Sequence, residues 1–348
     1  EASADSLHRA TSQTNGSTKW TLSTWIKRST LGSLDNGGTF MGTYASTSKR
    51  SQFAFLDNDK LYWNANNGAG TEGSATTAAV FRDVSAWYHV VLKIDTTQSS
   101  QSDRCKIYVN NVEQSLTFSG AMPAQNEANT GMYGSQYIGA SFYNTGTDRH
   151  FGGYLAETVM IDNSALEPDQ FGEFDEDSGI WKPIDVSGLT FGDNGFYFEY
   201  SDSSDLGVNS KGTDWTPNNL AAIDQSTDTC TNNFATLNPL NVNPSSAGDA
   251  FTEGNLKLAT SNNSNSAGST ATMAFTKGKW YAEVKYTSAT AWNGVMPTDA
   301  TINGDTGRMN WYQGRTLYLS GSNTANWGSN VSAGDIVGIA LDMDNSRV

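Results

Sequence analysis

The sequence has little cysteine, little proline and few positive charges. Its 348 residues include 2 Cys, 7 Pro and 21 Lys or Arg against 36 Asp or Glu, which gives a formal net charge of −15. Two distant cysteines, Cys105 and Cys230, form neither a disulfide framework nor a zinc site. The acidic balance argues against a nucleic-acid partner, because binding phosphates requires a cationic patch.

Long apolar runs are also missing. No stretch approaches the ~18 residues of a membrane span, and the first residues lack the basic-then-apolar pattern of a signal peptide. We therefore expect no insertion into a membrane. The chain opens at Glu1 rather than Met and stops at Val348, just after the turn-like DNSR. We expect native segments beyond both ends.

What the sequence does contain is typical of β structure. Hydrophobic residues make up 37% and charged residues only 16%, and Gly, Ser, Thr and Asn fill the difference. Helices would need more Ala, Leu, Glu and Lys. Aromatic residues reach 11%, including 10 Trp, and they bury large apolar areas. The composition predicts an all-β protein, and at ~100–200 residues per domain the length favours two domains.

Short strand patterns predict an antiparallel β-sandwich of the jelly-roll type over residues 1–170. Strands separated by turn signals indicate such a sandwich. The stretches that carry this prediction are WTLSTWI (20–26), FAFLDNDKLYW (53–63), WYHVVLKID (87–95), KIYVNNVEQ (106–114), QYIGASF (136–142) and GYLAETVMID (153–162).

Residues 171–250 predict an irregular acidic connector. The stretch 171–260 holds three Lys and no Arg against fourteen Asp or Glu, a net charge of −11. Aromatic residues can pin this connector to a neighbour; they are Phe196, Tyr197, Phe198, Trp215 and Phe234. A second β pattern, with strands at 277–286 and 334–344, predicts a further β-sandwich over residues 251–348.

Both predicted sandwiches resemble known families. Residues 1–170 resemble a laminin G-like domain of the concanavalin A-like lectin/glucanase type, through WTLSTWIKRS, SAWYHVVLKIDTT, KIYVNNVEQ and FGGYLAETVMIDNSAL. Asn111 stands where family members commonly have a glycine. Residues 251–348 resemble the front of a SPRY domain through GKWYAEV and AGDIVGIALDMDN. The aromatic strand that follows in SPRY domains is missing, so we expect this domain to be truncated at its C-terminus.

The order of the two domains, with FGEFDEDSGIWKP and TNNFATLNPL between them, is similar to structural proteins of marine tailed phages. This resemblance implies a virion or extracellular protein of the tail-fibre or adhesin type. Its implied partners are a cell-surface glycan or other virion proteins. A homo-oligomer is compatible with this role, although no heptad repeat indicates a trimer.

An acidic row is the strongest candidate for catalysis. Glu173, Asp175 and Asp177 occupy alternate positions, and alternate residues of a strand share one face. The row resembles the strand with which laminarinase-like enzymes cut β-glucans, and a retaining glycosidase needs two carboxyl groups about 5–5.5 Å apart. The row follows the last strand of the sandwich, however, and ends in loop signals at Ser178, Gly179 and Pro183. We favour a solvated acidic joint, with calcium as an optional ligand because hard cations favour several oxygen atoms.

Other polar candidates are weaker. Asp57, Asn58 and Asp59 are suited to calcium or to a β-turn, and the turn is the favoured interpretation. His89 alternates within an apolar strand, and the sequence has no Gly-x-Ser-x-Gly elbow for a Ser-His-Asp triad. His8 and His150 complete the histidines, which are too sparse for a zinc site. No cofactor is required.

Aromatic and amide side chains in loops are the favoured contacts with a ligand. Sugars stack their C–H faces on aromatic rings, and amides bond to their hydroxyl groups. Core packing uses many of the aromatic residues, so only part of the set is expected to be exposed. The predicted ligand-binding residues are Tyr62, Trp63, Asn64, Tyr143, Asn144, Trp292, Trp311, Tyr312 and Trp327.

The sequence therefore predicts a non-enzymatic virion appendage protein that recognises glycans or neighbouring virion proteins through loops on β-sandwiches. Two alternatives stay open. One is a polysaccharide-cleaving glycoside hydrolase of the laminarinase-like type that uses the acidic row. The other is a purely structural capsid or tail decoration protein.

Overall fold

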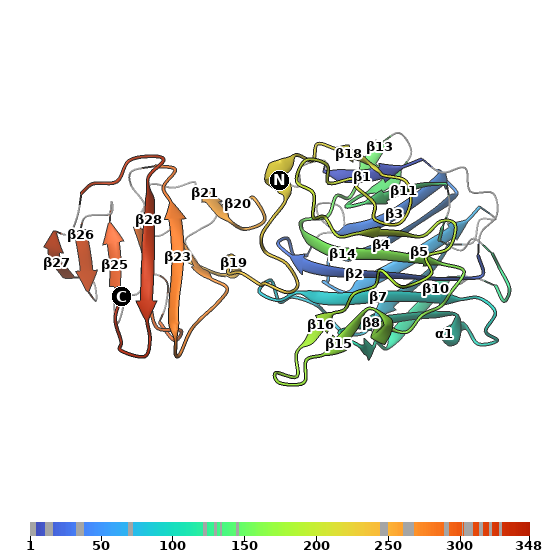
Figure 1. The fold of residues 1–348 in the computed structure, drawn as a ribbon, viewed down its shortest axis with the longest axis horizontal. Helices are drawn as coiled ribbons and strands as arrows, with labels where there is room; N and C mark the ends of the chain where they lie inside the picture. Colours follow the sequence, from blue (N-terminus) through green and yellow to red (C-terminus); the bar gives the residue numbers. More distant parts are fainter. Residues whose placement is uncertain are drawn as a thin grey trace. The chain divides into compact units, whose positions relative to one another are not determined.

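The structure is a computed structural model of the chain, shown in Figure 1. The chain divides into two compact units, Glu1–Phe234 and Ala235–Val348. The residues that the structure describes are 5–10, 17–32, 38–68, 72–120, 124–128, 131–132, 134–143, 146–243, 250–259, 268–288, 292–300, 302, 309–312, 316–319, 322–326 and 329–348.

An eight-stranded antiparallel sheet, called sheet A here, forms one layer of the first unit. Its strand order is β10-β6-β5-β4-β3-β11-β1-β18. The strands are β1 (Ser6–Arg9), β3 (Thr39–Ser46), β4 (Lys49–Phe55), β5 (Leu61–Asn67), β6 (Glu72–Thr77), β10 (Leu116–Gly120), β11 (Ser135–Ile138) and β18 (Thr216–Asn218).

A six-stranded antiparallel sheet, sheet B, forms the second layer, with the order β17-β14-β2-β7-β8-β9. The strands are β2 (Lys19–Arg28), β7 (Tyr88–Asp95), β8 (Cys105–Val109), β9 (Val112–Glu113), β14 (Gly153–Asp162) and β17 (Phe196–Phe198). The helix α1 (Gln101–Arg104) precedes β8, and Ser100 caps it by accepting a hydrogen bond from the Asp103 amide.

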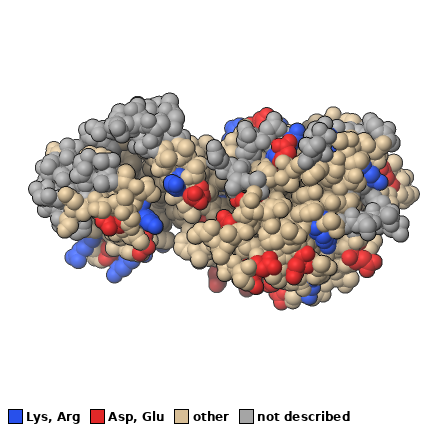
Figure 2. All heavy atoms as spheres, turned by 90° about the horizontal axis from the view of Figure 1, so that it is seen from above, with Lys and Arg blue, Asp and Glu red and all other residues tan. Residues whose placement is uncertain are grey.

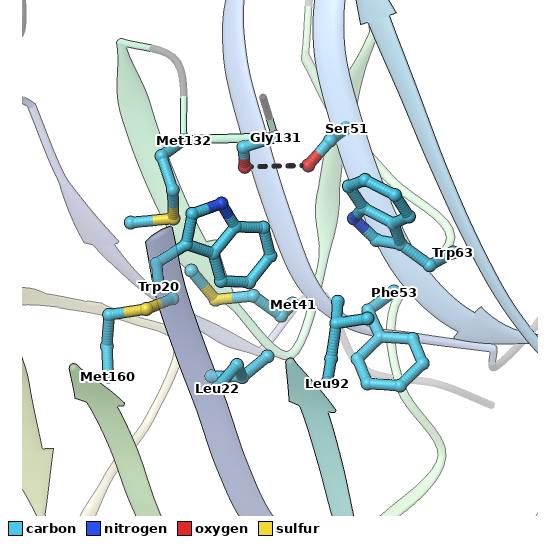
Figure 3. A pocket seen from close by; sticks show the side chains of 10 residues that line it. All are labelled: Trp20, Leu22, Met41, Ser51, Phe53, Trp63, Leu92, Gly131, Met132 and Met160. Atoms are coloured by element: carbon cyan, nitrogen blue, oxygen red, sulfur yellow. Dashed lines mark hydrogen bonds between the residues drawn. The ribbon is translucent and has the colours of Figure 1, made fainter. Parts of the chain in front are cut away.

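The core lies between the two sheets. Alternate residues of each strand point inward, so that Phe53 and Trp63 of sheet A fall in one buried cluster with Leu22 and Leu92 of sheet B. Figure 3 shows a small hollow in this core, with Trp20 and Trp63 beside it and the Ser51 hydroxyl donating to the Gly131 carbonyl at 2.9 Å. Its free space of ≈ 10 Å³ is at the lower limit for one water molecule.

The chain that follows the sandwich packs back onto sheet B. It contains η1 (Pro168–Gln170), the hairpin β15 (Gly172–Phe174) and β16 (Trp181–Pro183), and η2 (Ala222–Asp224). Phe171, Val186 and Phe191 form a buried cluster with Val91 and Val159 of sheet B. In Figure 1 the β15–β16 hairpin lies at the lower margin of the first unit.

Residues 171–234 therefore belong to the first unit, whereas the sequence pattern set residues 171–250 apart as a connector. β17 extends sheet B beside β14, and β18 extends sheet A beside β1. The predicted pinning role holds for Phe196, Phe198 and Trp215 in the main core cluster and for Tyr197 in the cluster on sheet B, whereas Phe234 is 46% exposed.

The second unit consists of small antiparallel sheets. β19 (Leu237–Val242) pairs with β22 (Ser269–Ala271), β20 (Ala250–Thr252) with β21 (Lys257–Ala259), and β23 (Lys279–Lys285) with β28 (Ile336–Asp342). A four-stranded sheet contains β24 (Trp292–Val295), β25 (Met309–Tyr312), β26 (Thr316–Leu319) and β27 (Ser322–Asn326).

The two units differ in where hydrophobic side chains are buried. The clusters of buried hydrophobic residues found in the described chain all lie in the first unit. In the second, Trp280 stacks on Phe275 with ring centroids 3.8 Å apart and remains exposed. The prediction of an all-β, antiparallel protein is confirmed. The likeness of residues 251–348 to a SPRY domain stays a prediction. Within the described residues, no helix is long and apolar enough to cross a membrane.

Candidate functional site

The outer face of sheet A carries a continuous row of polar side chains across neighbouring strands. Met41 and Phe53 point into the core, so the alternate residues Gly42 and Gln52 point outward. Gln52 lies opposite Asn64, Asn64 opposite Ser74, and Ser74 opposite Ser119. We call Gln52, Asn64, Ser74 and Ser119 the amide row.

Two further rows flank the amide row on the same face. On one side Arg50 lies between Tyr44 and Asn66. On the other side Tyr62 lies opposite Ala54 and Thr76, and Thr76 opposite Thr117. Thr117 and Ser119 on β10 are exposed, and Tyr62 and Asn66 on β5 are half-buried. The face thus combines amides, hydroxyls, a guanidinium and an aromatic ring on rigid strands.

A hairpin rises over this face and forms a wall at one end of the rows. It consists of β12 (Ser141–Tyr143) and β13 (Gly146–Asp148). A Cβ atom on Gly42 would lie 2.6 Å from the Ala140 carbonyl oxygen, so glycine is what lets the hairpin approach the sheet. Phe142 packs on Tyr44 and Tyr137, with ring centroids 4.5 and 5.5 Å apart.

A shallow hollow lies where the wall meets the amide row. Its lining includes Arg50, Gln52 and Asn64 from the sheet and Phe142 and Arg149 from the hairpin and the residues after it. Arg149 Nη1 donates to Gln52 Oε1 at 3.2 Å. Gln52 is only 8% exposed, and Asn64 is buried as well. The hollow therefore presents polar groups that are held in fixed positions.

The outer face of sheet B is closed by the chain that follows the sandwich. Trp25, Trp87 and Trp181 form a buried cluster there. Lys27 is completely buried on this face, and its Nζ lies 2.7 Å from Asp228 Oδ2. The same Nζ donates to the Phe234 carbonyl at 2.6 Å. These contacts cover the outer face of sheet B. On the outer face of sheet A, Arg50, Tyr62 and Asn66 are half-buried, whereas Gln52 and Asn64 are buried.

His89 lies under this closed face and is not arranged as a catalytic base. Trp181 Nε1 donates to His89 Nδ1 at 2.9 Å, so Nδ1 is the unprotonated nitrogen and Nε2 donates to Ser23 Oγ at 2.8 Å. A base in a serine triad would instead accept the serine proton. Burial lowers the pKa of His89 to about 3, which keeps the ring neutral.

The acidic row lies on the exposed β15–β16 hairpin. Lys182 Nζ lies 3.4 Å from Glu173 Oε1 and 3.2 Å from Asp175 Oδ2. Hydrogen bonds from the Ser178 amide and hydroxyl, and then from Lys182, lower the pKa of Asp175 to about 2. Asp175 Oδ1 also accepts from the Asp177 amide at 3.2 Å. Asp175 is therefore an ionised turn-forming residue, unlike the protonated acid that a glycosidase needs.

Asp59 uses its carboxylate within the protein. It accepts from the Gly32 amide at 2.8 Å and forms ion pairs with Arg28 at 3.0 Å and Arg82 at 2.7 Å. Its φ of 63° places it in the left-handed region, which suits the predicted turn at residues 57–59. The guanidinium groups of Arg28 and Arg82 thus pair with the two carboxylate oxygen atoms of Asp59 that a calcium ion would need as ligands. Calcium binding elsewhere stays a prediction.

The predicted ligand-binding residues divide into four groups. Trp63 is a correction: it is 1% exposed, because its position on β5 points into the core (Figure 3). Tyr62 and Asn64 point to the opposite side and share the outer face of sheet A. Trp292 on β24 is 42% exposed in the second unit. The others are placed only on their strands or lie outside the described side chains; they are Tyr143, Asn144, Trp311, Tyr312 and Trp327.

Sequence reasoning missed Arg50, Gln52 and Arg149. Arg50 and Gln52 alternate with Ser51 and Phe53 on β4, and this alternation was the available signal for one outward face. No local signal brings Arg149 to them, since it follows a hairpin about one hundred residues later. Figure 2 shows Lys and Arg scattered over the face in view, and among its coloured residues they do not merge into a continuous patch.

Residues 3–171 match the family model described as the concanavalin A-like lectin/glucanases superfamily. No curated protein matches the chain.

Among solved structures, the SAP-like pentraxin of Limulus polyphemus is 15% identical, over 48% of this chain and 73% of that one, with a TM-score of 0.34. The CBM40 of the Ruminococcus gnavus IT-sialidase, bound to α2,3-sialyllactose, is 13% identical over 44% and 79%, with a TM-score of 0.33. Domains LG4-5 of the mouse laminin α1 chain are 13% identical over 56% and 44%, with a TM-score of 0.33.

Proposed function

We propose that this protein binds a carbohydrate on the outer face of sheet A. The match of residues 3–171 to the family model of the concanavalin A-like lectin/glucanases superfamily supports this proposal. One observation carries the proposal. The sandwich covers the outer face of sheet B with its own chain, while the outer face of sheet A presents the amide row beside a wall.

The chemistry of the face suits sugars. The amides of Gln52, Asn64 and Asn66 offer donors and acceptors, and the hydroxyls of Ser74 and Thr76 do the same. The half-buried ring of Tyr62 lies in the flanking row, where the C–H face of a sugar can stack on it. Side chains on paired strands are held more rigidly than side chains on loops, which lowers the entropy cost of binding.

The proposal extends to the biological role. We propose that the protein is a non-catalytic, fibre- or adhesin-type component of a phage virion and that its partner is a cell-surface glycan. The resemblance of the domain order to marine phage structural proteins supports the virion role. The exposed position and strong ionisation of Asp175 support the absence of catalysis by the acidic row. A decoration protein that contacts only other virion proteins is the alternative.

Binding to a panel of immobilised marine and bacterial polysaccharides tests the proposal. We expect at least one to bind, and we expect Gln52→Ala and Asn64→Ala each to weaken that binding by about tenfold, since each removes a hydrogen-bonding side chain. Gln170→Ala is the matched control, because it removes an exposed amide from η1 beside the closed face. Wild-type protein that binds no glycan, while it co-purifies with virion proteins, would favour the decoration role.

A further inference from the structure

We propose that the carbohydrate carries a negatively charged group, either a carboxylate or a sulfate ester, and that Arg50, Arg149 and Gln52 receive this group in the hollow at the wall. The inference rests on the proposed function and specifies the chemical class of its ligand. It depends on the donors that converge on the hollow, on the size of the hollow and on the charge around it.

The side chain of Gln52 presents a donor to the hollow. A guanidinium can only donate hydrogen bonds, so the contact from Arg149 Nη1 fixes Gln52 Oε1 toward Arg149 and turns Gln52 Nε2 the other way. Within the described part of the chain, Gln52 Nε2 donates to no protein atom, although the side chain is more than nine-tenths buried. Gln52 Nε2 is not among the side-chain atoms that are closed off from solvent, so an acceptor that enters the hollow can reach it.

Two guanidinium groups line the same hollow. Arg50 reaches it from β4, and Arg149 reaches it from the end of the hairpin. Arg50 Nη1 also donates to the Thr47 carbonyl, and Arg149 Nη1 donates to Gln52 Oε1. With Gln52 Nε2, the two guanidinium groups place N–H donors and positive charge on both sides of the hollow. An oxyanion accepts from several donors at once, and hydrogen bonds between guanidinium groups and carboxylates are among the strongest in proteins. A neutral sugar hydroxyl would use only part of this donor set.

The hollow is too small for a sugar ring. Its free space of ≈ 10 Å³ corresponds to one water-sized group. An oxygen of a carboxylate or sulfate has this size, so the ring itself would lie on the amide row and direct a substituent into the hollow. The wall formed by Phe142 and Ser141 stops the ligand at this point.

The surrounding charge makes a local cationic site necessary for an anion. The whole chain carries a formal charge of −15, which repels anionic polymers at long range. Asp148 Oδ2 lies 4.0 Å from Arg149 Nε, but the Asp148 side chain is 53% exposed and does not line the hollow. Water therefore screens Asp148, while the guanidinium groups act at close range.

Paired polysaccharides provide the test. Alginate and pectate are compared with their carboxyl-reduced forms, carrageenan with its desulfated form, and agarose and laminarin serve as neutral probes. We expect the whole chain to bind at least one charged polymer, with a loss of at least about tenfold when the charged group is removed. Which pair responds distinguishes carboxylate from sulfate. Raising the salt from ~50 to ~500 mM should weaken the same complex.

Variants locate the effect. Arg50→Gln and Arg149→Gln should each weaken binding of the charged polymer by about tenfold or more. Arg104→Gln, which removes the same charge at α1, should leave binding unchanged. Circular dichroism and thermal unfolding check that each variant folds, and the salt dependence of the wild type provides a readout that needs no variant.

The outcomes separate this inference from the proposed function. Binding to a neutral polymer that depends on Asn64 but not on Arg50 or Arg149 would overturn the charged-group inference and leave carbohydrate binding intact. Equal binding to a polymer before and after removal of its charged groups would do the same. Binding to no polymer of the panel would overturn both.

Discussion

The two outer faces of the same sandwich have opposite surroundings. On sheet B, a later stretch of the chain buries Trp25, Trp87 and Trp181 and closes the face around the ion pair of Lys27 with Asp228. On sheet A, the corresponding face carries amides and hydroxyls in register across four strands. Both faces belong to one fold, so the fold alone does not decide where a ligand binds.

The contrast shows how function is assigned within a two-sheet domain. A sandwich fills its core with the inward side chains of both sheets and leaves two outer faces. One of these faces can be covered by apolar residues from a segment outside the sandwich, as sheet B is here. Burial of such residues then contributes to the stability of the fold. The remaining face can keep polar side chains at little cost, because water satisfies them when no ligand is bound.

The largest expected effect comes from the charge buried on the closed face. Lys27→Met leaves Asp228 buried without its cation, and such a loss typically costs about 3–5 kcal/mol of unfolding free energy. Denaturant unfolding measures this cost. Arg50→Met, the matched change on the open face, should alter the unfolding free energy by only about 0.5 kcal/mol or less. Similar losses in the two variants would show that the two faces do not differ as described.

Much of the first unit could be predicted from the sequence. The stretches 20–26, 87–95 and 153–162 correspond to β2, β7 and β14, because alternation and apolar runs report local burial. The hairpin at residues 106–114 turns at Asn110 and Asn111, and both have positive φ as the turn requires.

The rest of the site depends on pairing between distant segments. The amide row becomes visible only when β10, β6, β5 and β4 are placed side by side. The sequence pattern of residues 171–234 indicates a connector, because Phe171, Val186 and Phe191 follow neither a strand period nor a helix period. In the structure these three side chains are nevertheless buried against sheet B. The prediction that Trp63 contacts a ligand is wrong, because aromatic type alone does not tell an inward position from an outward one.

The second prediction concerns the wall on the open face. Gly42→Ala would place a Cβ 2.6 Å from the Ala140 carbonyl and 2.9 Å from Ser141 Cα, both of which are backbone atoms. Overpacking of this kind typically costs about 1–3 kcal/mol, and here it should also displace the hairpin and weaken glycan binding. Gly146→Ala on the same hairpin is the control, because a Cβ there meets nothing within 4 Å. Thermal unfolding and binding assays would contradict the prediction if the two variants behaved alike.

The third prediction concerns pH and the closed face. His89 has a folded pKa of about 3 against an ordinary 6.5, so the unfolded chain takes up a proton that the folded protein excludes. The stability that depends on a neutral His89 is complete above pH 6.5 and is lost as the pH falls, by about 1.4 kcal/mol per unit. Glu157 acts in the opposite direction, because burial raises the pKa of its carboxyl.

Unfolding free energies between pH 7 and pH 5 measure this dependence. His89→Gln should be less stable at pH 7, since it disturbs the contacts with Ser23 and Trp181, and it should lose most of the slope above pH 5. His150→Gln, which changes a half-buried histidine outside the closed face, should keep the slope. A wild-type stability that stays constant over this range would contradict the buried, neutral state of His89.

The smallest expected effect comes from the acidic row. Glu173→Gln and Asp177→Asn change exposed carboxylates on the β15–β16 hairpin, so we expect no measurable change in the unfolding midpoint and none in glycan binding. Incubation of the wild type with laminarin, agarose and carrageenan, followed by a reducing-end assay, should show no release of sugar. If the wild type released reducing ends and Glu173→Gln did not, the acidic row would be catalytic and the hydrolase alternative would replace the binding proposal. Activity that both proteins shared would show that the carboxylate of Glu173, which lies 3.4 Å from Lys182 Nζ, takes no part in the reaction.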